Sequence, residues 1–168
     1  YYRIVATYSE GGQSDSAELE GIRYNSDMLS LDDDRNWILT RTFNCDNHGD
    51  AEEEQITYDV GYYDGLGYAS QNVQIYASGD GRGDIIQPFV YDGLYREELQ
   101  HLPYTLNANN GKSDDATLAN QEEFYKTRYG LTTDPHAYVR TEYEPSALNR
   151  VLSTHKPGAE YQSDTHSM

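Results

Sequence analysis

A four-residue motif, Tyr-Asp-Gly-Leu, occurs twice in the chain and constrains its fold more than any other feature. The first copy begins at Tyr63 and the second at Tyr91, so the copies lie 28 positions apart (91 minus 63). Asp-Gly directly after a strand is a strong hairpin signal, because glycine accepts the positive φ that a tight turn requires. A repeat of this size cannot bury its own apolar face and needs neighbouring repeats to cover it. The motif therefore predicts a series of antiparallel hairpins.

The composition is typical of a β-rich extracellular protein. The chain holds 17 tyrosines but only 3 phenylalanines, and tyrosine rings cover sheet faces while their hydroxyls stay in water. There are 29 acidic and 12 basic residues, which give a net charge of -17. This charge argues against nucleic acid and anionic membranes as partners and leaves cations as the natural small ligands. No apolar run is long enough to cross a bilayer, so we expect no membrane insertion.

Alternation of apolar with polar residues predicts strands along most of the chain. Ile56, Tyr58, Val60 and Tyr62, for example, alternate with polar residues or glycine. Pro88 places its strand at an edge or a bulge, because proline cannot donate to the ladder. The predicted strands are 2–8, 16–22, 36–43, 56–62, 72–77, 85–91, 99–104, 137–142 and 150–154.

One segment has the signals of a helix. Ser113, Asp114 and Asp115 are suited to cap a helix over residues 116–129, and Gly130 is well placed to end it. The expected fold class is therefore mainly β, with antiparallel hairpins and one short helix near 116–129.

The sequence divides into three parts. Residues 1–22 carry Tyr-x-Ile-x-Ala, a glycine-rich turn and Ser-Asp-Ser. This pattern resembles the last two strands of a fibronectin type III domain and predicts a terminal hairpin. Residues 23–35 are polar and acidic, as expected of a linker. Residues 36–168 form the remaining domain and contain both copies of the motif.

The loop 79–84 is the most attractive candidate for a binding site. It alternates glycine with Asp80, Arg82 and Asp84, and carboxylates and carbonyls in such a loop could surround calcium. An EF-hand loop requires more acidic positions and a terminal glutamate, which are absent. A glycine-rich turn between strands is therefore the preferred interpretation. Asp80 and Asp84 remain weak candidate ligands for calcium, which is the one candidate cofactor. The acidic runs 32–34 and 52–54 could also bind cations weakly.

No set of residues shows a recognisable catalytic pattern, so we expect that the chain is not an enzyme. The acidic runs 32–34 and 52–54 are typical of solvated loop faces. Cys45 and His48 alone do not supply the four ligands of a zinc site. In so acidic a chain, nothing singles out the carboxylate pair of a glycosidase. The five histidines are dispersed without metal-ligand spacing: His48, His101, His136, His155 and His166.

The repeated motif resembles the YD repeats of Rhs proteins, whose pattern is approximately Tyr-Asp-x-x-Gly-Arg followed by a strand. From about residue 36 to 165, the chain is similar to the domain that precedes the repeats in Rhs proteins of Bacteroidetes. Two positions depart from the repeat pattern: Tyr68 stands where arginine is usual, and Tyr95 where glycine is usual. Both departures put the geometry of the turns in doubt. The resemblance is carried by segments 36–42, 62–67, 83–88, 90–92, 102–104, 121–125, 143–152 and 157–158.

Within these segments, the most specific is Glu144-Pro145-Ser146-Ala147-Leu148-Asn149-Arg150-Val151-Leu152. The residues expected to carry the structural motif are Tyr63, Asp64, Gly65, Tyr91, Asp92, Gly93, Glu144, Pro145, Asn149 and Arg150.

The resemblance implies a segment of a large secreted or surface protein of the polymorphic toxin type. In that superfamily, the repeats form a hollow β-shell around a C-terminal effector domain. The expected function is therefore a non-catalytic structural one, contributing to or capping such a shell, with the rest of the parent chain as its partner. An extracellular adhesion or carbohydrate-binding module is the alternative, favoured by the tyrosines and the fibronectin-like hairpin.

Overall fold

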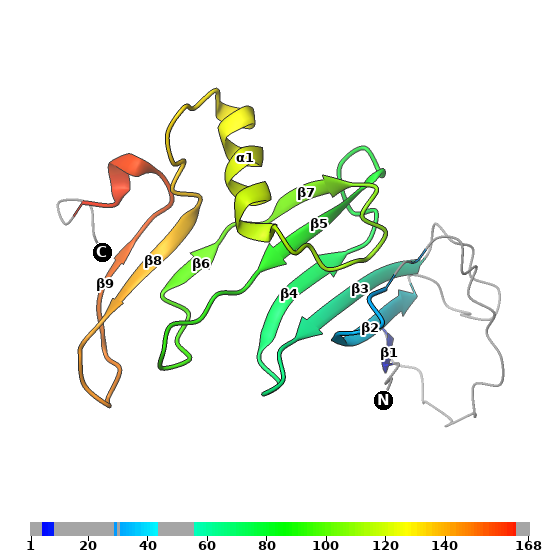
Figure 1. The fold of residues 1–168 in the computed structure, drawn as a ribbon, viewed down its shortest axis with the longest axis horizontal. Coiled ribbons are helices and arrows are strands. Elements are labelled where there is room, and N and C mark those ends of the chain that lie inside the picture. Colours follow the sequence, from blue (N-terminus) through cyan, green and yellow to red (C-terminus); the bar gives the residue numbers. More distant parts are fainter. Residues whose placement is uncertain (1–4, 9–28, 30, 44–55, 164–168) are drawn as a thin grey trace. The chain divides into compact units, whose positions relative to one another are not determined.

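The computed structural model describes residues 5–8, 29, 31–43 and 56–163 (Figure 1). The described part of the chain is mainly β with one α-helix, which confirms the predicted class. The predicted return strand 16–22, most of the proposed linker, and Cys45 with His48 lie outside the described residues. In the described part of the chain, no helix has the length and apolar character needed to cross a membrane.

Strand pairing gives a six-stranded and a three-stranded sheet. In the larger sheet, β2, β3 and β4 pair in antiparallel fashion, and β1 pairs with β2 in parallel, with Val5 opposite Thr40. Its strands, in spatial order, are β1 (Val5–Tyr8), β2 (Asn36–Phe43), β3 (Ile56–Tyr63), β4 (Ala69–Gln74), β5 (Gly83–Pro88) and β7 (Tyr104–Asn107). The smaller sheet is antiparallel, in the order β6 (Leu99–His101), β8 (Tyr138–Tyr143) and β9 (Val151–His155).

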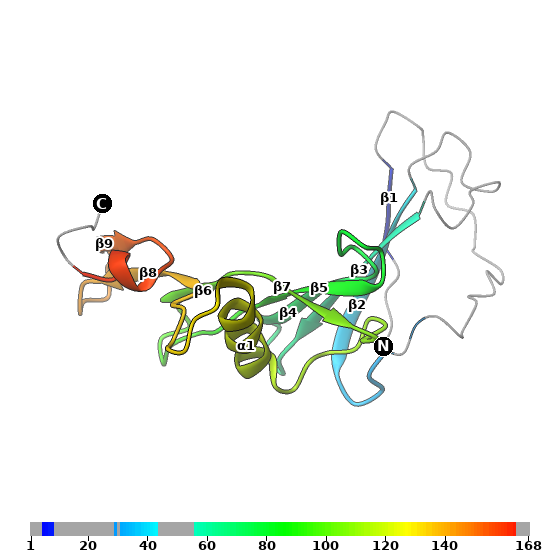
Figure 2. The same cartoon turned by 90° about the horizontal axis from the view of Figure 1, so that it is seen from above.

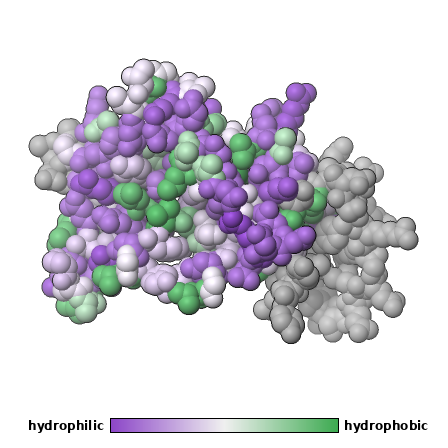
Figure 3. Space-filling view, in the orientation of Figure 1, coloured by the Kyte–Doolittle hydropathy of each residue, from purple (hydrophilic) through white to green (hydrophobic). Residues whose placement is uncertain are grey.

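The chain forms two compact units. The first comprises residues 1–85 and 106–113, and the second comprises residues 86–105 and 114–168. Strand alternation builds the first core: along β2, every second side chain from Leu39 is buried. The buried apolar residues are Leu39, Phe43, Val60, Tyr62, Val73 and Ile75 in the first unit, and Ile86, Tyr104 and Ala137 in the second. Much of the face in Figure 3 is hydrophilic, and apolar residues show there in small groups.

Three predicted strands differ from the observed ones. The strand predicted to continue to residue 77 ends at Gln74, and Tyr76 adopts a positive φ of 52° while its N–H donates to Asp84. The strand predicted over 85–91 spans 83–88 and ends at Pro88. The segment 99–104 divides at Leu102 and Pro103 into β6 and β7, which belong to different sheets.

The helix is confirmed as α1 (Thr117–Tyr129). Gly130 ends it in the left-handed conformation, and its N–H donates to the carbonyl of Lys126. At the other end, the N-cap residue is Ala116 and no described side chain caps the first turn, so the predicted cap by residues 113–115 is wrong. The Asp114 carboxylate accepts the N–H of Ala116 at 2.9 Å, just before the helix. Helix α1 lies beside β6 (Figure 2), where Gln121 contacts His101 and bonds to the carbonyls of Leu102 and Ala137.

Candidate functional site

The first Tyr-Asp-Gly-Leu motif forms a loop from Asp64 to Tyr68 between the paired strands β3 and β4. One carboxylate oxygen of Asp64 accepts the backbone N–H groups of Leu66 and Tyr68, both at 2.9 Å. The N–H of Asp64 donates to the carbonyl of Tyr68, and the N–H of Gly67 donates to the carbonyl of Asp64. Gly67 has φ 90°, a backbone conformation that favours glycine.

The second motif forms the same loop between Asp92 and Arg96. Asp92 accepts the N–H groups of Leu94 and Arg96 at 2.8 and 2.9 Å, and its own N–H donates to the carbonyl of Arg96. The N–H of Tyr95 donates to the carbonyl of Asp92, and Tyr95 occupies the left-handed position with φ 57°. Unlike the first loop, this one lies between β5 and β6, which belong to different sheets.

The specific segment from Glu144 to Arg150 forms a longer version of this loop between β8 and β9. The N–H of Glu144 donates to the carbonyl of Arg150, and the N–H of Arg150 approaches the Glu144 carboxylate at 3.4 Å. Asn149 precedes the final residue and has φ 51°. We call these three segments, 64–68, 92–96 and 144–150, the acid-closed loops.

A leucine directly precedes the left-handed residue in each acid-closed loop. Leu66, Leu94 and Leu148 are 68%, 66% and 72% exposed. Isolated exposed leucines are ordinary on protein surfaces. Their position before the left-handed residue is shared by all three loops, although the N–H of Leu148 donates to the Ser146 hydroxyl and not to the acid.

The prediction that the glycine of Asp-Gly supplies the positive φ is wrong. Gly65 and Gly93 are not among the residues with positive φ, which is found two positions later, at Gly67 and Tyr95. The Asp-Gly rule applies to two-residue hairpin turns, whereas these loops are longer and are closed by the aspartate side chain. The doubt raised by Tyr68 and Tyr95 is also resolved, because both loops make the same backbone hydrogen bonds.

Arginine side chains strengthen the two acid-closed loops of the second unit. Arg96 donates to Asp92 through Nε at 2.7 Å and to Asn149 through a terminal nitrogen at 3.0 Å, and its guanidinium lies 4.9 Å from the ring centroid of Tyr143. Arg150 donates through Nε to Glu144 at 3.0 Å. The N–H of Arg96 is the main cause of the lowered pKa of Asp92. The hydroxyl of Ser146 is the main cause of the lowered pKa of Glu144.

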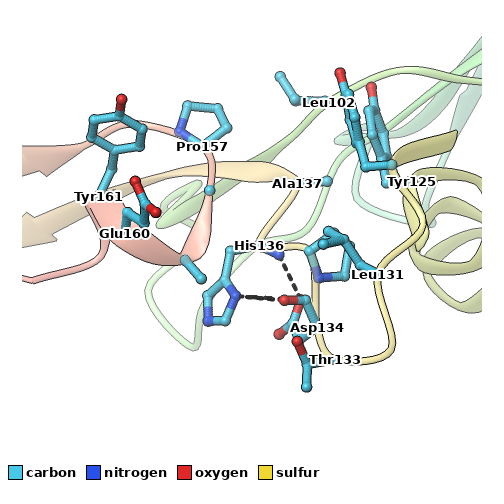
Figure 4. A pocket seen from close by; sticks show the side chains of 14 residues that line it. Leu102, Tyr125, Leu131, Thr133, Asp134, His136, Ala137, Pro157, Glu160 and Tyr161 are labelled. Carbon is cyan, nitrogen blue, oxygen red and sulfur yellow. Dashed lines mark hydrogen bonds and ion pairs between the residues drawn. The ribbon is translucent and has the colours of Figure 1, made fainter.

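A pocket of about 450 Å³ lies elsewhere in the second unit (Figure 4). Three segments, together with Leu102, form its walls: the C-terminal part of α1, the loop 131–137, and the turn 157–161, which includes the 3-10 helix η3 (Ala159–Tyr161). The rings of Tyr125 and Tyr129 are stacked, with centroids 6.2 Å apart and planes inclined by 16°. None of the pocket residues was predicted as a site, because they come from segments that are distant in sequence.

Comparison with known families gives a match to a domain of unknown function, DUF6443, over residues 36–168. The chain belongs to the DUF6443 family. No curated protein and no solved structure matches it. Every described residue of the acid-closed loops and of the pocket lies in the DUF6443 region.

The candidate calcium ligands of the DUF6443 region are engaged in other contacts. Asp84 is fully buried and accepts the backbone N–H groups of Tyr76 and Gly111 at 2.9 and 2.7 Å. Exposed Asp80 accepts the Ser78 hydroxyl and the N–H of Arg82, and the Ser78 bond is the main cause of its lowered pKa. Among the described residues, no group of three or more His, Cys, Asp or Glu side chains could hold a metal. Calcium binding stays a prediction, which titration with a thermal-unfolding readout would test.

One cluster in the DUF6443 region brings serine, histidine and glutamate together. His155 is fully buried on β9, and its Nε2 lies 3.1 Å from Ser153 Oγ and 3.7 Å from Glu142 Oε1. In a Ser-His-acid triad, the acid contacts the ring nitrogen opposite the one that faces serine. Here both groups approach Nε2, and Nδ1 has no hydrogen-bond partner among the residues that the structure describes. The cluster therefore lacks the geometry of a triad.

Proposed function

We propose that this chain is a non-catalytic structural segment of a large secreted or surface protein of the Rhs/YD-repeat type. In that protein it contributes to, or caps, a β-shell that encloses a C-terminal effector domain. The observation that carries the proposal is the recurrence of the acid-closed loop. The pattern Tyr-Asp-x-x-Gly-Arg contains the three positions that such a loop needs. These are an acid that accepts backbone N–H groups, a residue suited to the left-handed conformation, and an arginine whose side chain binds the acid.

The chemistry of the loops supports a structural role. Asp64 and Asp92 each direct a carboxylate oxygen at two backbone N–H groups of their own loop. Such bonds order a turn, as expected of Asp at the start of a loop. A small unit with strands and exposed loop leucines also suits an array, in which neighbouring units cover each other's apolar surface.

The parent polypeptide offers the test. We expect its sequence to continue into many Tyr-Asp repeats and a variable C-terminal domain, and we expect that domain to resist added protease. Deletion of residues 36–168 should expose it to cleavage, whereas the single variant Asp115→Asn, on an exposed residue outside the loops, should not. A parent protein without a repeat array, or unchanged resistance after the deletion, would contradict the proposal.

An extracellular adhesion or carbohydrate-binding module is the second candidate, because tyrosine rings such as those of Tyr129 and Tyr161 are exposed. Saturable binding to a glycan array by the 168-residue chain would favour it, provided that replacement of these tyrosines abolished the binding.

A further inference from the structure

The pocket of the second unit has aromatic walls on both sides. Figure 4 shows Tyr161 and Glu160 across the pocket from Tyr125 and Leu131. Tyr129 and Tyr161 are 64% and 42% exposed, so both side chains present part of their surface at the pocket. The faces of aromatic rings carry partial negative charge and attract cations.

The lining of the pocket carries carboxylates and one histidine, His136, whose Nδ1 lies 3.8 Å from Asp134 Oδ1. The contact with Glu122 is the main cause of the raised pKa of Lys126, and the Asp134 carboxylate adds to it. Asp134 and Glu160 are exposed pocket residues, and none of the lining residues is lysine or arginine. The C-terminal end of α1, which carries partial negative charge, also lies at the pocket through Tyr129. The two basic residues of the last helical turn are engaged: Lys126 pairs with Glu122 at 2.5 Å, and the Arg128 guanidinium lies 6.0 Å from the ring centroid of Phe124.

The walls are held in place by the chain's own hydrogen bonds. The hydroxyl of Tyr125 donates to the carbonyl of Pro103 at 2.6 Å. The N–H of His136 donates to Asp134 at 2.7 Å, and the carbonyl of His136 accepts the N–H of Gly158 at 2.9 Å. This last bond joins two of the three wall segments. A site fixed in advance loses less free energy to ordering when a ligand binds.

We propose that this pocket binds the cationic side chain of an arginine presented by a basic segment of a partner protein. The guanidinium would lie against the tyrosine rings with its N–H groups toward Asp134 and Glu160, an arrangement that suits its planar shape. A sugar would also stack on tyrosine and donate its hydroxyls to the carboxylates, but it lacks the positive charge that carboxylates and ring faces attract. This inference goes beyond the structural role proposed above and does not depend on it.

The test uses two small probes that differ in charge but hardly in shape. The 168-residue chain is titrated with N-acetyl-arginine amide and, separately, with N-acetyl-citrulline amide, and the amide signals of Gly130, His136 and Gly158 are followed by NMR. We expect saturable shifts with the arginine probe. Binding of the citrulline probe should be weaker by roughly 2- to 30-fold, the range expected when a cation over an aromatic face is lost.

Matched variants locate the site. Glu160→Gln and Tyr129→Leu, both at exposed positions, should weaken binding of the arginine probe. Glu123→Gln, on an exposed residue of α1 outside the pocket, should leave it unchanged. Equal binding of the two probes, shifts produced by maltose but not by arginine, or no shift with any probe would each overturn the proposal.

Discussion

The loops that begin at Asp64 and Asp92 share their backbone hydrogen bonds and differ in what supports them. The first has glycine at its left-handed position and Tyr68 at its end, whereas the second has Tyr95 at the left-handed position and Arg96 at its end. The first loop therefore keeps the usual glycine of the repeat pattern and lacks the arginine, and the second keeps the arginine and lacks the glycine. The aspartate and its two backbone contacts are common to both. The acid therefore defines the loop, while glycine and arginine are separable supports.

A parallel difference exists in the interior of the two units. Tyr62, in the first unit, donates its hydroxyl to the backbone carbonyl of Gly111 at 2.7 Å. Tyr104, in the second unit, donates its hydroxyl to the carboxylate of Asp114 and lies 3.0 Å from the hydroxyl of Thr117. Burial is the main cause of the raised pKa of both phenols. One unit thus anchors its tyrosine on a backbone carbonyl with the Asp32 carboxylate nearby, and the other bonds its tyrosine directly to a carboxylate.

The largest expected effect comes from removing these hydroxyls. Tyr104→Phe should lower the free energy of unfolding by about 1.5–3 kcal/mol, because it removes a hydrogen bond to a charged acceptor. Tyr62→Phe removes a bond to a neutral carbonyl and should cost about 0.5–1.5 kcal/mol. Urea unfolding followed by circular dichroism measures both. Equal losses would show that the charge of Asp114 adds nothing to the contact.

Exchanging the left-handed residues should have opposite effects in the two loops. Gly67→Ala should destabilise the protein by about 1–2 kcal/mol, because an L-residue is strained there. An added Cβ at this position meets no atom within 4 Å, so the cost would be that of the backbone alone. Tyr95→Gly should stabilise by up to about 1 kcal/mol, since relief of strain is offset by the greater freedom of glycine in the unfolded chain. Thermal unfolding measures these changes, and stabilisation by Gly67→Ala would contradict a shared left-handed position.

Changing the residue that ends each loop should have a smaller effect. Arg96→Ala removes the contacts with Asp92 and Asn149, and it should cost about 0.2–1 kcal/mol at this partly exposed site. Tyr68→Arg introduces the usual residue opposite Asp64 and should gain at most a similar amount. Arg96→Lys serves as the control for charge, because lysine cannot form the planar contact of arginine. If Arg96→Lys had the same free energy of unfolding in urea as the wild type, the planar contact of the guanidinium would not contribute to stability.

The dependence on pH should be the smallest effect and should involve the second loop. Because the pKa of Asp92 is lowered in the folded chain, its ionised carboxylate stabilises the fold at any pH above the usual pKa of an aspartate. That contribution is lost as the pH falls below about 4 toward the lowered value. NMR titration of the Asp92 carboxyl should give a lowered pKa in the wild type and a pKa closer to the usual value in Arg96→Ala. An identical value in the two proteins would assign the whole shift to backbone N–H groups.

Local patterns were sufficient to predict the helix and some of the strands. Alternation places β2 at its observed bounds, and Gly130 ends α1 where the sequence indicates. The left-handed positions could not be located in the same way, because the side-chain bonds of Asp64 and Asp92 determine them. The division of 99–104 depends on long-range contacts, since the N–H of Leu102 donates to the carbonyl of Ala137.

The buried Asp84 shows why the candidate sites were harder to predict. Its bond to the N–H of Gly111 joins residues 27 positions apart. The same glycine has φ 84°, and a Cβ there would meet the side chain of Ile75 at 2.8 Å. Nothing in the local sequence of loop 79–84 indicates that its last acid faces an interior amide. The pocket is equally non-local, since three separate segments form it.

The acid-closed loops also have a consequence for the order of folding. Their defining bonds join residues no more than six positions apart, as from Glu144 to Arg150. So short a segment closes within a few microseconds at most. Long-range contacts form much more slowly. Each loop can therefore form before the strands that flank it have found their partners. In an array of such units, folding could begin at many turns at once and would not depend on the completion of any one sheet.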